Sequence, residues 1–184
     1  MVWDAYTSKQ FATALPRGEF DVSKFYGPYN GLLNDIFLKR EDFMVVPQYK
    51  RSEYAKAAVD FTTVFIVTHN EHPVFFLEIK PSGHIQHNSS REAADLQMRE
   101  WFRILFDDVE IPILYGVSAI GTRLCIYTWN KETRRITPNA IPIDPDVTSD
   151  TAPAARWDLE LMTAEGEERL RELVRHIKEM SAQL

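Results

Sequence analysis

The feature that most constrains the fold is a pair of neighbouring apolar runs within residues 59–81, V-D-F-T-T-V-F-I-V-T-H-N-E-H-P-V-F-F-L-E-I-K-P. Both runs are rich in Val, Ile, Phe and Thr, which favour β-strands, and the H-N-E-H-P stretch between them fits a hairpin loop. Because the runs are almost continuously apolar, both of their faces should be covered. This pattern predicts two central strands, over 60–68 and 74–80.

Charged residues mark the ends of these two runs: Asp60 opens the first, and Glu78 and Lys80 close the second. Side chains alternate along a strand, so Glu78 and Lys80 share one face of the sheet. If the strands pair antiparallel, the start of the first lies beside the end of the second, which brings Asp60 to Glu78. Two carboxylates together with the Ile79 carbonyl would form a hard oxygen site suited to Mg²⁺ or Mn²⁺.

The other elements follow from periodicity and end signals. Ser89 and Glu92 form a capping box that starts a middle helix, and Thr163 precedes the last helix. We expect one domain over 1–184, with an α/β fold in which helices flank a mixed five-stranded sheet. Its parts are a helix over 29–40, strands over 43–49, 60–68, 74–80, 112–119 and 122–129, a core over 29–129, a surface-wrapping tail over 138–162 and a C-terminal helix over 163–182.

Asp60, seventeen further residues and then Glu78-Ile79-Lys80 resemble the PD-(D/E)XK motif of the restriction-endonuclease-like nuclease superfamily. The proline that usually precedes the aspartate is Val59 here, which changes no catalytic group. The resemblance implies an αβββαβ core and metal-dependent hydrolysis of nucleic acid, DNA rather than RNA. By the same resemblance, Asp60, Glu78 and the Ile79 carbonyl would hold Mg²⁺ or Mn²⁺ and Lys80 would assist the attacking water.

A second motif of the superfamily matches in part. Some members carry a glutamine and a tyrosine on the middle helix, and this chain has Gln97 and, four residues later, Trp101. Gln97 is therefore a further catalytic or orienting candidate, and equally a boundary residue that bonds to nearby backbone. Some members add an acidic group from the first helix, for which Asn34 and Asp35 are the polar candidates.

Other interpretations stay open. The three charges could form a structural ion pair at solvated strand ends, where such pairs contribute little. The fold could instead be catalytically inactive and serve as a binding or protein-interaction module, or an unrelated α/β protein could carry the motif by chance. His84 and His87 are expected in a loop, with no partners for a zinc site.

Clustered basic and aromatic residues are expected to play ordinary structural roles. Charges of this kind usually form a solvated face, although arginines near the site could clamp a phosphate backbone. The basic residues are Arg91, Arg99 and Arg103 on the middle helix and Lys131, Arg134 and Arg135 in a turn. The large aromatic residues are expected in the core rather than at a base-stacking surface: Phe65, Phe75, Phe76, Trp101, Phe102 and Trp129.

Composition narrows the class of protein. The 184 residues carry a formal net charge of −6, which disfavours non-specific nucleic-acid binding but permits a local basic face. Cys125 is the single cysteine, and neither a secretory signal nor a membrane-spanning run is expected, which favours an intracellular protein, cytoplasmic or nuclear. The apolar face of the last helix could serve a homodimer interface.

Overall fold

A computed structural model describes residues 3–47, 63–142 and 149–184 of the chain. Asp60 and the rest of 48–62 lie outside these described residues. Four α-helices are present in this part of the chain: α1 Ala5–Ala14, α2 Tyr26–Ile36, α3 Asn88–Leu105 and α4 Ala164–Ser181. Short 3-10 turns punctuate the chain at Val22–Phe25, Lys39–Glu41, Ser82–Gln86, Phe106–Asp108 and Ala154–Arg156.

A single mixed sheet organises the fold, in the spatial order β1-β2-β3-β4-β5-β6, with β7 also paired to β5. All neighbouring strands are antiparallel except β3 and β4, which are parallel and are joined through α3. The strands are β1 Phe43–Pro47, β2 Thr63–His69, β3 His72–Lys80, β4 Ile113–Ile120, β5 Arg123–Asn130, β6 Arg135–Thr137 and β7 Leu159–Glu160.

The α/β class and the mixed sheet are confirmed, but the prediction of five strands is wrong, since the described residues already form a sheet of seven. The two strands that the sequence did not predict, β6 and β7, have three and two residues. Such short segments carry too few residues for an alternating pattern, and only their pairing with β5 makes them strands.

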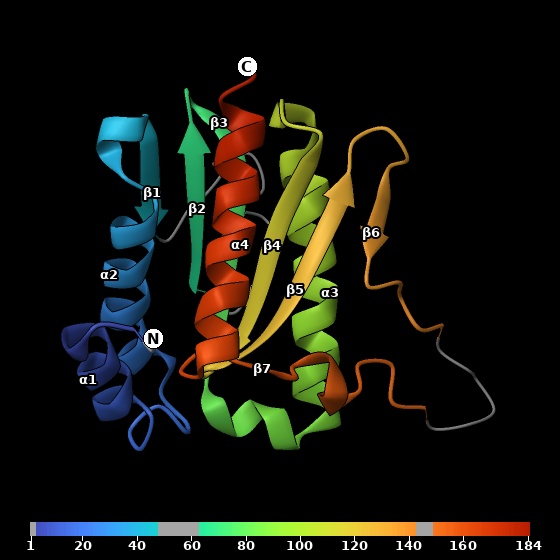
Figure 1. The fold of residues 1–184 in the computed structure, drawn as a ribbon. Helices are drawn as coiled ribbons and strands as arrows, with labels where there is room; N and C mark the ends of the chain where they lie inside the picture. The colour runs from blue at the N-terminus through green and yellow to red at the C-terminus, as the bar shows by residue number, and fades with distance from the viewer. Residues whose placement is uncertain (1–2, 48–62, 143–148) are drawn as a thin grey trace.

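Helices cover both faces of the sheet. Figure 1 shows α4 over one face and α3 behind the other, with α2 beside β1 and α1 beside α2. Successive residues of β3 contact opposite layers: the ring of Phe76 packs 4.8 Å from Phe102 of α3, and the ring of Phe75 packs 5.5 Å from Phe37 after α2. The even-numbered residues of β3, Glu78 and Lys80 among them, therefore belong to the α3 face.

Two predicted helix boundaries need correction. The helix predicted over 29–40 runs from Tyr26 to Ile36, because the extended backbone of Phe37 ends it and lets that ring pack against Phe43. The predicted capping box of Ser89 and Glu92 is wrong. α3 already begins at Asn88, so His87 is the N-cap residue, and its side chain makes no capping hydrogen bond.

The last helix begins as predicted. The Thr163 hydroxyl accepts a hydrogen bond from the backbone N–H of Gly166 at 3.1 Å, which caps α4. The preceding segment, within the tail predicted to wrap the surface over 138–162, inserts two side chains into the core. Ala152 and Trp157 are fully buried, and the Trp157 indole N–H donates to the Ser118 hydroxyl at 3.2 Å.

Candidate functional site at the end of β3

A tight hairpin sets the register between β2 and β3. Its two turn residues, Asn70 and Glu71, both have positive φ, at 49° and 71°, as the favoured two-residue hairpin turns require. The resulting register pairs Thr63 with Ile79 and Val64 with Glu78. The start of β2 therefore lies beside the end of β3, as the sequence predicts.

Glu78 occupies the most enclosed position of this hairpin. Its side chain is 0% exposed, between Val64 of β2 and Ser118 of β4 in the sheet register. Neither carboxylate oxygen has a hydrogen-bond partner among residues 3–47, 63–142 and 149–184. Burial raises the pKa of Glu78 to about 7, and the nearby Lys80 ammonium opposes that rise only in part. The strand thus buries a carboxyl group whose two oxygens accept no hydrogen bond from the described residues.

Lys80 is the one charged partner of Glu78 in the described part of the chain. Its Nζ lies 3.5 Å from Glu78 Oε1, close enough for an ion pair and long for a hydrogen bond. The Lys80 side chain is 13% exposed, so it links the buried carboxylate to the surface. The predicted sharing of one face by these two residues is confirmed.

The remaining predicted ligands stay predictions. Asp60 lies outside the described residues, so its approach to Glu78 is not part of the structure. Ile79 stands between Thr63 and Ala119 in the sheet register, with its side chain 1% exposed.

The donor set near Glu78 suits a hard cation as far as it is described. No group of three or more His, Cys, Asp or Glu side chains that could hold a metal occurs within 3–47, 63–142 and 149–184. The carboxylate of Glu78 nevertheless offers two oxygen atoms that accept no hydrogen bond from the described residues, and carboxylate oxygens are ligands that Mg²⁺ and Mn²⁺ prefer. A second carboxylate, for which Asp60 is the candidate, would be needed to complete such a site.

The helices α3 and α2 carry the remaining polar candidates for the site. Gln97 lies half-buried on α3, beside Met98, which is buried in the core, and its catalytic or orienting role stays a prediction. Asn34 donates a hydrogen bond to the Asn30 carbonyl one turn back in α2 at 2.8 Å, and Asp35 is exposed. Asn34 therefore acts within its own helix.

The loop after Lys80 carries the two histidines. A 3-10 turn, Ser82–Gln86, leads from β3 to α3, with His84 half-buried in it and His87 exposed. The pKa of His84 is lowered, first by burial and then by the positive charges of Lys80 and His87. The surroundings of His84 therefore favour its neutral form.

Two arginines considered as backbone clamps are structural instead. Arg91 is 4% exposed and donates to the carbonyls of Ile85 and Ala152, both at 2.8 Å. Arg99 donates to Asp95 at 2.8 Å and to the Pro138 carbonyl at 2.8 Å. Their guanidinium groups hold the tail against α3.

The other basic and aromatic side chains largely follow expectation. Arg103 is exposed and pairs with Glu100, and Lys131 lies in the predicted β5–β6 turn, where it donates to the Val109 carbonyl at 2.8 Å. Five of the six predicted core aromatics are buried, and Trp101 is half-buried against the core. The five are Phe65, Phe75, Phe76, Phe102 and Trp129.

One exposed aromatic at this end of the sheet was not predicted. Phe20 is 82% exposed, on a loop whose Gly18 and Glu19 carbonyls accept hydrogen bonds from the backbone N–H groups of Ser82 and Gly83, both at 3.0 Å. A Cβ on Gly83 would lie 2.7 Å from the Glu19 carbonyl oxygen, so glycine permits the close approach. Phe20 was missed because one apolar residue between two acids has no sequence signal.

Comparison with protein-family models, with curated proteins and with solved structures found no match to this chain. Among the described residues, no helix is long and apolar enough to cross a membrane. The function is therefore argued from the geometry at the end of β3.

Proposed function

We propose that the protein is a metal-dependent phosphodiesterase that hydrolyses nucleic acid, DNA in preference to RNA, at a PD-(D/E)XK-type site. One observation carries the proposal: Glu78 is fully buried on a central strand, both its oxygens lack hydrogen bonds from the described residues, and Lys80 is its ion-pair partner. Buried polar groups are almost always satisfied, so an unsatisfied carboxylate indicates a role beyond stability.

The order of elements supports the same proposal. α2, β1, β2, β3, α3 and β4 follow one another along the chain, which is the αβββαβ order that the motif resemblance implies. The E-x-K residues end the central strand β3, next to the start of β2, and the helix with Gln97 follows directly. The proposed relation to the restriction-endonuclease-like superfamily rests on this order of elements and on the D…E-x-K motif.

The residues would divide the chemistry as follows. Glu78, Asp60 and the Ile79 carbonyl would hold Mg²⁺ or Mn²⁺, which when bound polarises a phosphodiester and lowers the pKa of a water. The Lys80 ammonium would orient the attacking water and stabilise the negative charge that develops on the phosphate oxygens. Gln97 would orient the site from α3. The low polarity around Glu78 would strengthen each of these electrostatic effects.

Phe20 supports a nucleic-acid substrate. Its ring is 82% exposed on a loop that is hydrogen-bonded to the residues just after Lys80. Exposed aromatic rings stack on unpaired bases, and such stacking contributes roughly 1–3 kcal/mol per base. A base next to the scissile phosphate would therefore find a stacking partner beside the site.

The test is cleavage of single-stranded and double-stranded DNA in Mg²⁺ and in Mn²⁺. Glu78→Ala and Lys80→Ala should each abolish metal-dependent cleavage while far-ultraviolet circular dichroism stays that of the wild type. Glu167→Gln is the matched control, because Glu167 is also buried, at 8% exposure, but lies on α4. Cleavage by the Glu78→Ala variant at the wild-type rate would contradict the proposal.

A second candidate function is a catalytically inactive nuclease-like fold that serves as a binding or protein-interaction module. The complete burial of Glu78 favours it, because a metal ion and a water must reach that carboxylate for catalysis. Calorimetry with Mn²⁺ separates the two functions when it is combined with a broad nuclease assay. Absence of both metal binding and cleavage would favour the module.

A further inference from the structure

The outer edge of β5 is interrupted at its middle. β7 pairs with its first residues, Arg123 and Leu124, and β6 pairs with its last three, from Thr128 onward. Between these two short strands, neither supplies a partner to Cys125, Ile126 or Tyr127. β6 and β7 thus lie along the same edge of β5, separated by a gap opposite three residues of β5.

The backbone of Ile126 opens into this gap. The Thr122 carbonyl accepts from the Leu161 N–H at 2.9 Å, and the Asn130 carbonyl accepts from the Arg134 N–H at 2.8 Å, both on the outer side of β5. Backbone groups alternate in direction along a regular antiparallel strand, and the β4–β5 register runs without a shift. The N–H and C=O of Ile126 therefore both point outward, where no strand formed by the described residues meets them.

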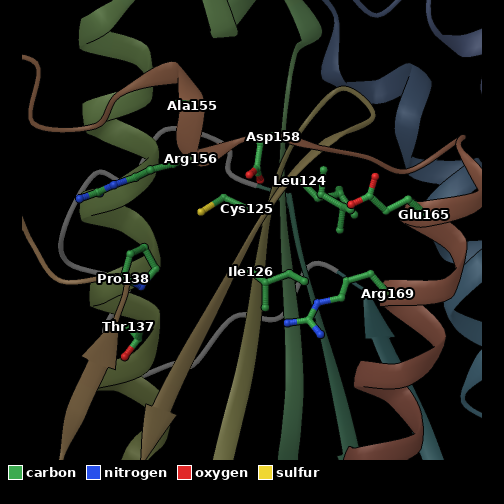
Figure 2. A pocket seen from close by; sticks show the side chains of 11 residues that line it. Leu124, Cys125, Ile126, Thr137, Pro138, Ala155, Arg156, Asp158, Glu165 and Arg169 are labelled. Atoms are coloured by element: carbon green, nitrogen blue, oxygen red, sulfur yellow. The ribbon is translucent and has the colours of Figure 1, made fainter.

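A cavity of about 470 Å³ lies over the gap. Figure 2 shows Glu165 and Arg169 extending from α4 toward the strand, with Thr137 and Pro138 on the other side. The cavity is lined by side chains from the strand edge, from the tail and from α4: Leu124, Cys125, Ile126, Thr137, Pro138, Ala155, Arg156, Asp158, Leu159, Glu165 and Arg169.

The unmatched charge in this cavity is negative. The guanidinium of Arg156 is committed to Asp95 at 2.7 Å and to the Asn139 carbonyl at 2.8 Å, and Arg169 pairs with Glu172 at 3.3 Å. Asp158 and Glu165 form no ion pair with any residue that the structure describes. A ligand with a positive charge would complement these two carboxylates.

We propose that the gap binds a short basic peptide segment, which completes the interrupted strand beside β5. Three strand residues span about 10 Å, the length that β6 and β7 leave open. The central residue would exchange two backbone hydrogen bonds with Ile126, and its side chain would lie on the α4 face beside Glu165, because residues opposite each other share a face. The flanking residues would face the buried Cys125 and Tyr127, so small side chains suit them.

The test titrates acetyl-Ala-Lys-Ala-amide into the full chain, with binding followed by the backbone amide resonance of Ile126. The control ligand is the same peptide methylated at the central amide nitrogen, which cannot donate to the Ile126 carbonyl. Loss of that hydrogen bond should weaken binding about tenfold. The acidic peptide acetyl-Ala-Glu-Ala-amide should bind more weakly than the lysine peptide.

Two variants test whether the carboxylate of Glu165 binds the positive charge of the peptide. Glu165→Gln should weaken binding of the lysine peptide several-fold, whereas Glu168→Gln, on the same helix and outside the cavity lining, should leave it unchanged. Equal binding of the methylated and unmethylated peptides would overturn the proposal, and so would no binding of any of the three peptides. This outcome is independent of the nuclease assay, because the cavity lies at the outer edge of β5 and neither Glu78 nor Lys80 lines it.

Discussion

Two buried carboxylates on the same side of the sheet have opposite surroundings. Asp95 of α3 is 6% exposed and receives four hydrogen bonds, from two guanidinium nitrogens of Arg99, from Arg156 and from the Tyr127 hydroxyl, at 2.8, 3.1, 2.7 and 2.8 Å. Glu78 of β3 is 0% exposed and receives none from the part of the chain that the structure describes, with Lys80 at 3.5 Å as its ion-pair partner.

The contrast separates a structural carboxylate from a functional one. Breaking a fully satisfied buried ion-pair network leaves charges unpaired, so Asp95 is expected to stabilise the attachment of the tail to α3 and β5. An unsatisfied buried carboxylate destabilises the fold until another ligand or a proton meets it. Glu78 is therefore expected to cost stability in the free protein and to supply binding energy for a cation.

The largest expected effect is on catalysis at Glu78. Glu78→Gln keeps the size of the side chain and removes its charge, and it should lower metal-dependent cleavage by roughly 10²–10³-fold, the scale of losing one electrostatic catalytic group. Asp95→Asn should keep the cleavage rate per folded molecule close to that of the wild type. Equal losses in the two variants would remove the distinction between the two carboxylates.

For the free energy of unfolding, we expect the larger loss on substitution of Asp95 and not of Glu78. Asp95→Ala leaves Arg99 and Arg156 without their shared partner and should lower the free energy of unfolding by about 3 kcal/mol. Urea denaturation measures this loss. The control is Glu100→Ala, which breaks an exposed pair with Arg103 and should cost less than about 1 kcal/mol. A loss for Asp95→Ala no larger than for the control would show that its network is not stabilising.

A pH titration sharpens the comparison further. The folded protein raises the pKa of Glu78 from 4.5 to about 7 because of burial, so the folded state favours the protonated carboxyl. The stabilisation that this group contributes is fully present below pH 4.5, its pKa in the unfolded chain, and is lost as pH rises through about 7, its pKa in the folded protein. The free energy of unfolding should fall by about 3 kcal/mol over this range. Unfolding free energies measured across this range should show the loss in the wild type and not in Glu78→Gln. The same slope in both proteins would assign the pH dependence to another group.

The smallest expected effect concerns Phe20. Phe20→Ala should weaken binding of single-stranded DNA by about 1–3 kcal/mol and should change double-stranded binding less, because paired bases are already stacked. Fluorescence anisotropy with labelled oligonucleotides measures both. Met44→Ala is the control, since Met44 is 61% exposed on β1, an edge strand of the sheet. Identical affinities for Phe20→Ala and the wild type would exclude a stacking role.

The sequence predicted the long central strands and the last helix, but not the two short strands at the edge of β5. Strands β2 to β5 and the helix α4 carry long apolar patterns or clear caps, and the alternation along β3 placed Glu78 and Lys80 on one face. β6 and β7 were missed because tertiary pairing alone defines them.

The candidate site was predictable only in part. The E-x-K spacing indicated the ion pair, but burial of Glu78 to 0% exposure depends on the α3 face above it, which the sequence does not show. Arg91 and Arg99 looked like surface charges, because their partners Asp150 and Pro138 come from the distant tail. The anchoring of the Phe20 loop to Gly83 is likewise a long-range backbone contact without a local signal.

The most direct test of the central claim is calorimetric titration of Mn²⁺ into the wild type and into Glu78→Gln at about pH 8, above the pKa of the buried carboxyl. Mn²⁺ should bind the wild type and raise its melting temperature, because a ligand at about 100 times its dissociation constant stabilises by about 2.7 kcal/mol. Glu78→Gln should show neither effect. Equal Mn²⁺ binding by both proteins, or by neither, would contradict the assignment of Glu78 as a metal ligand.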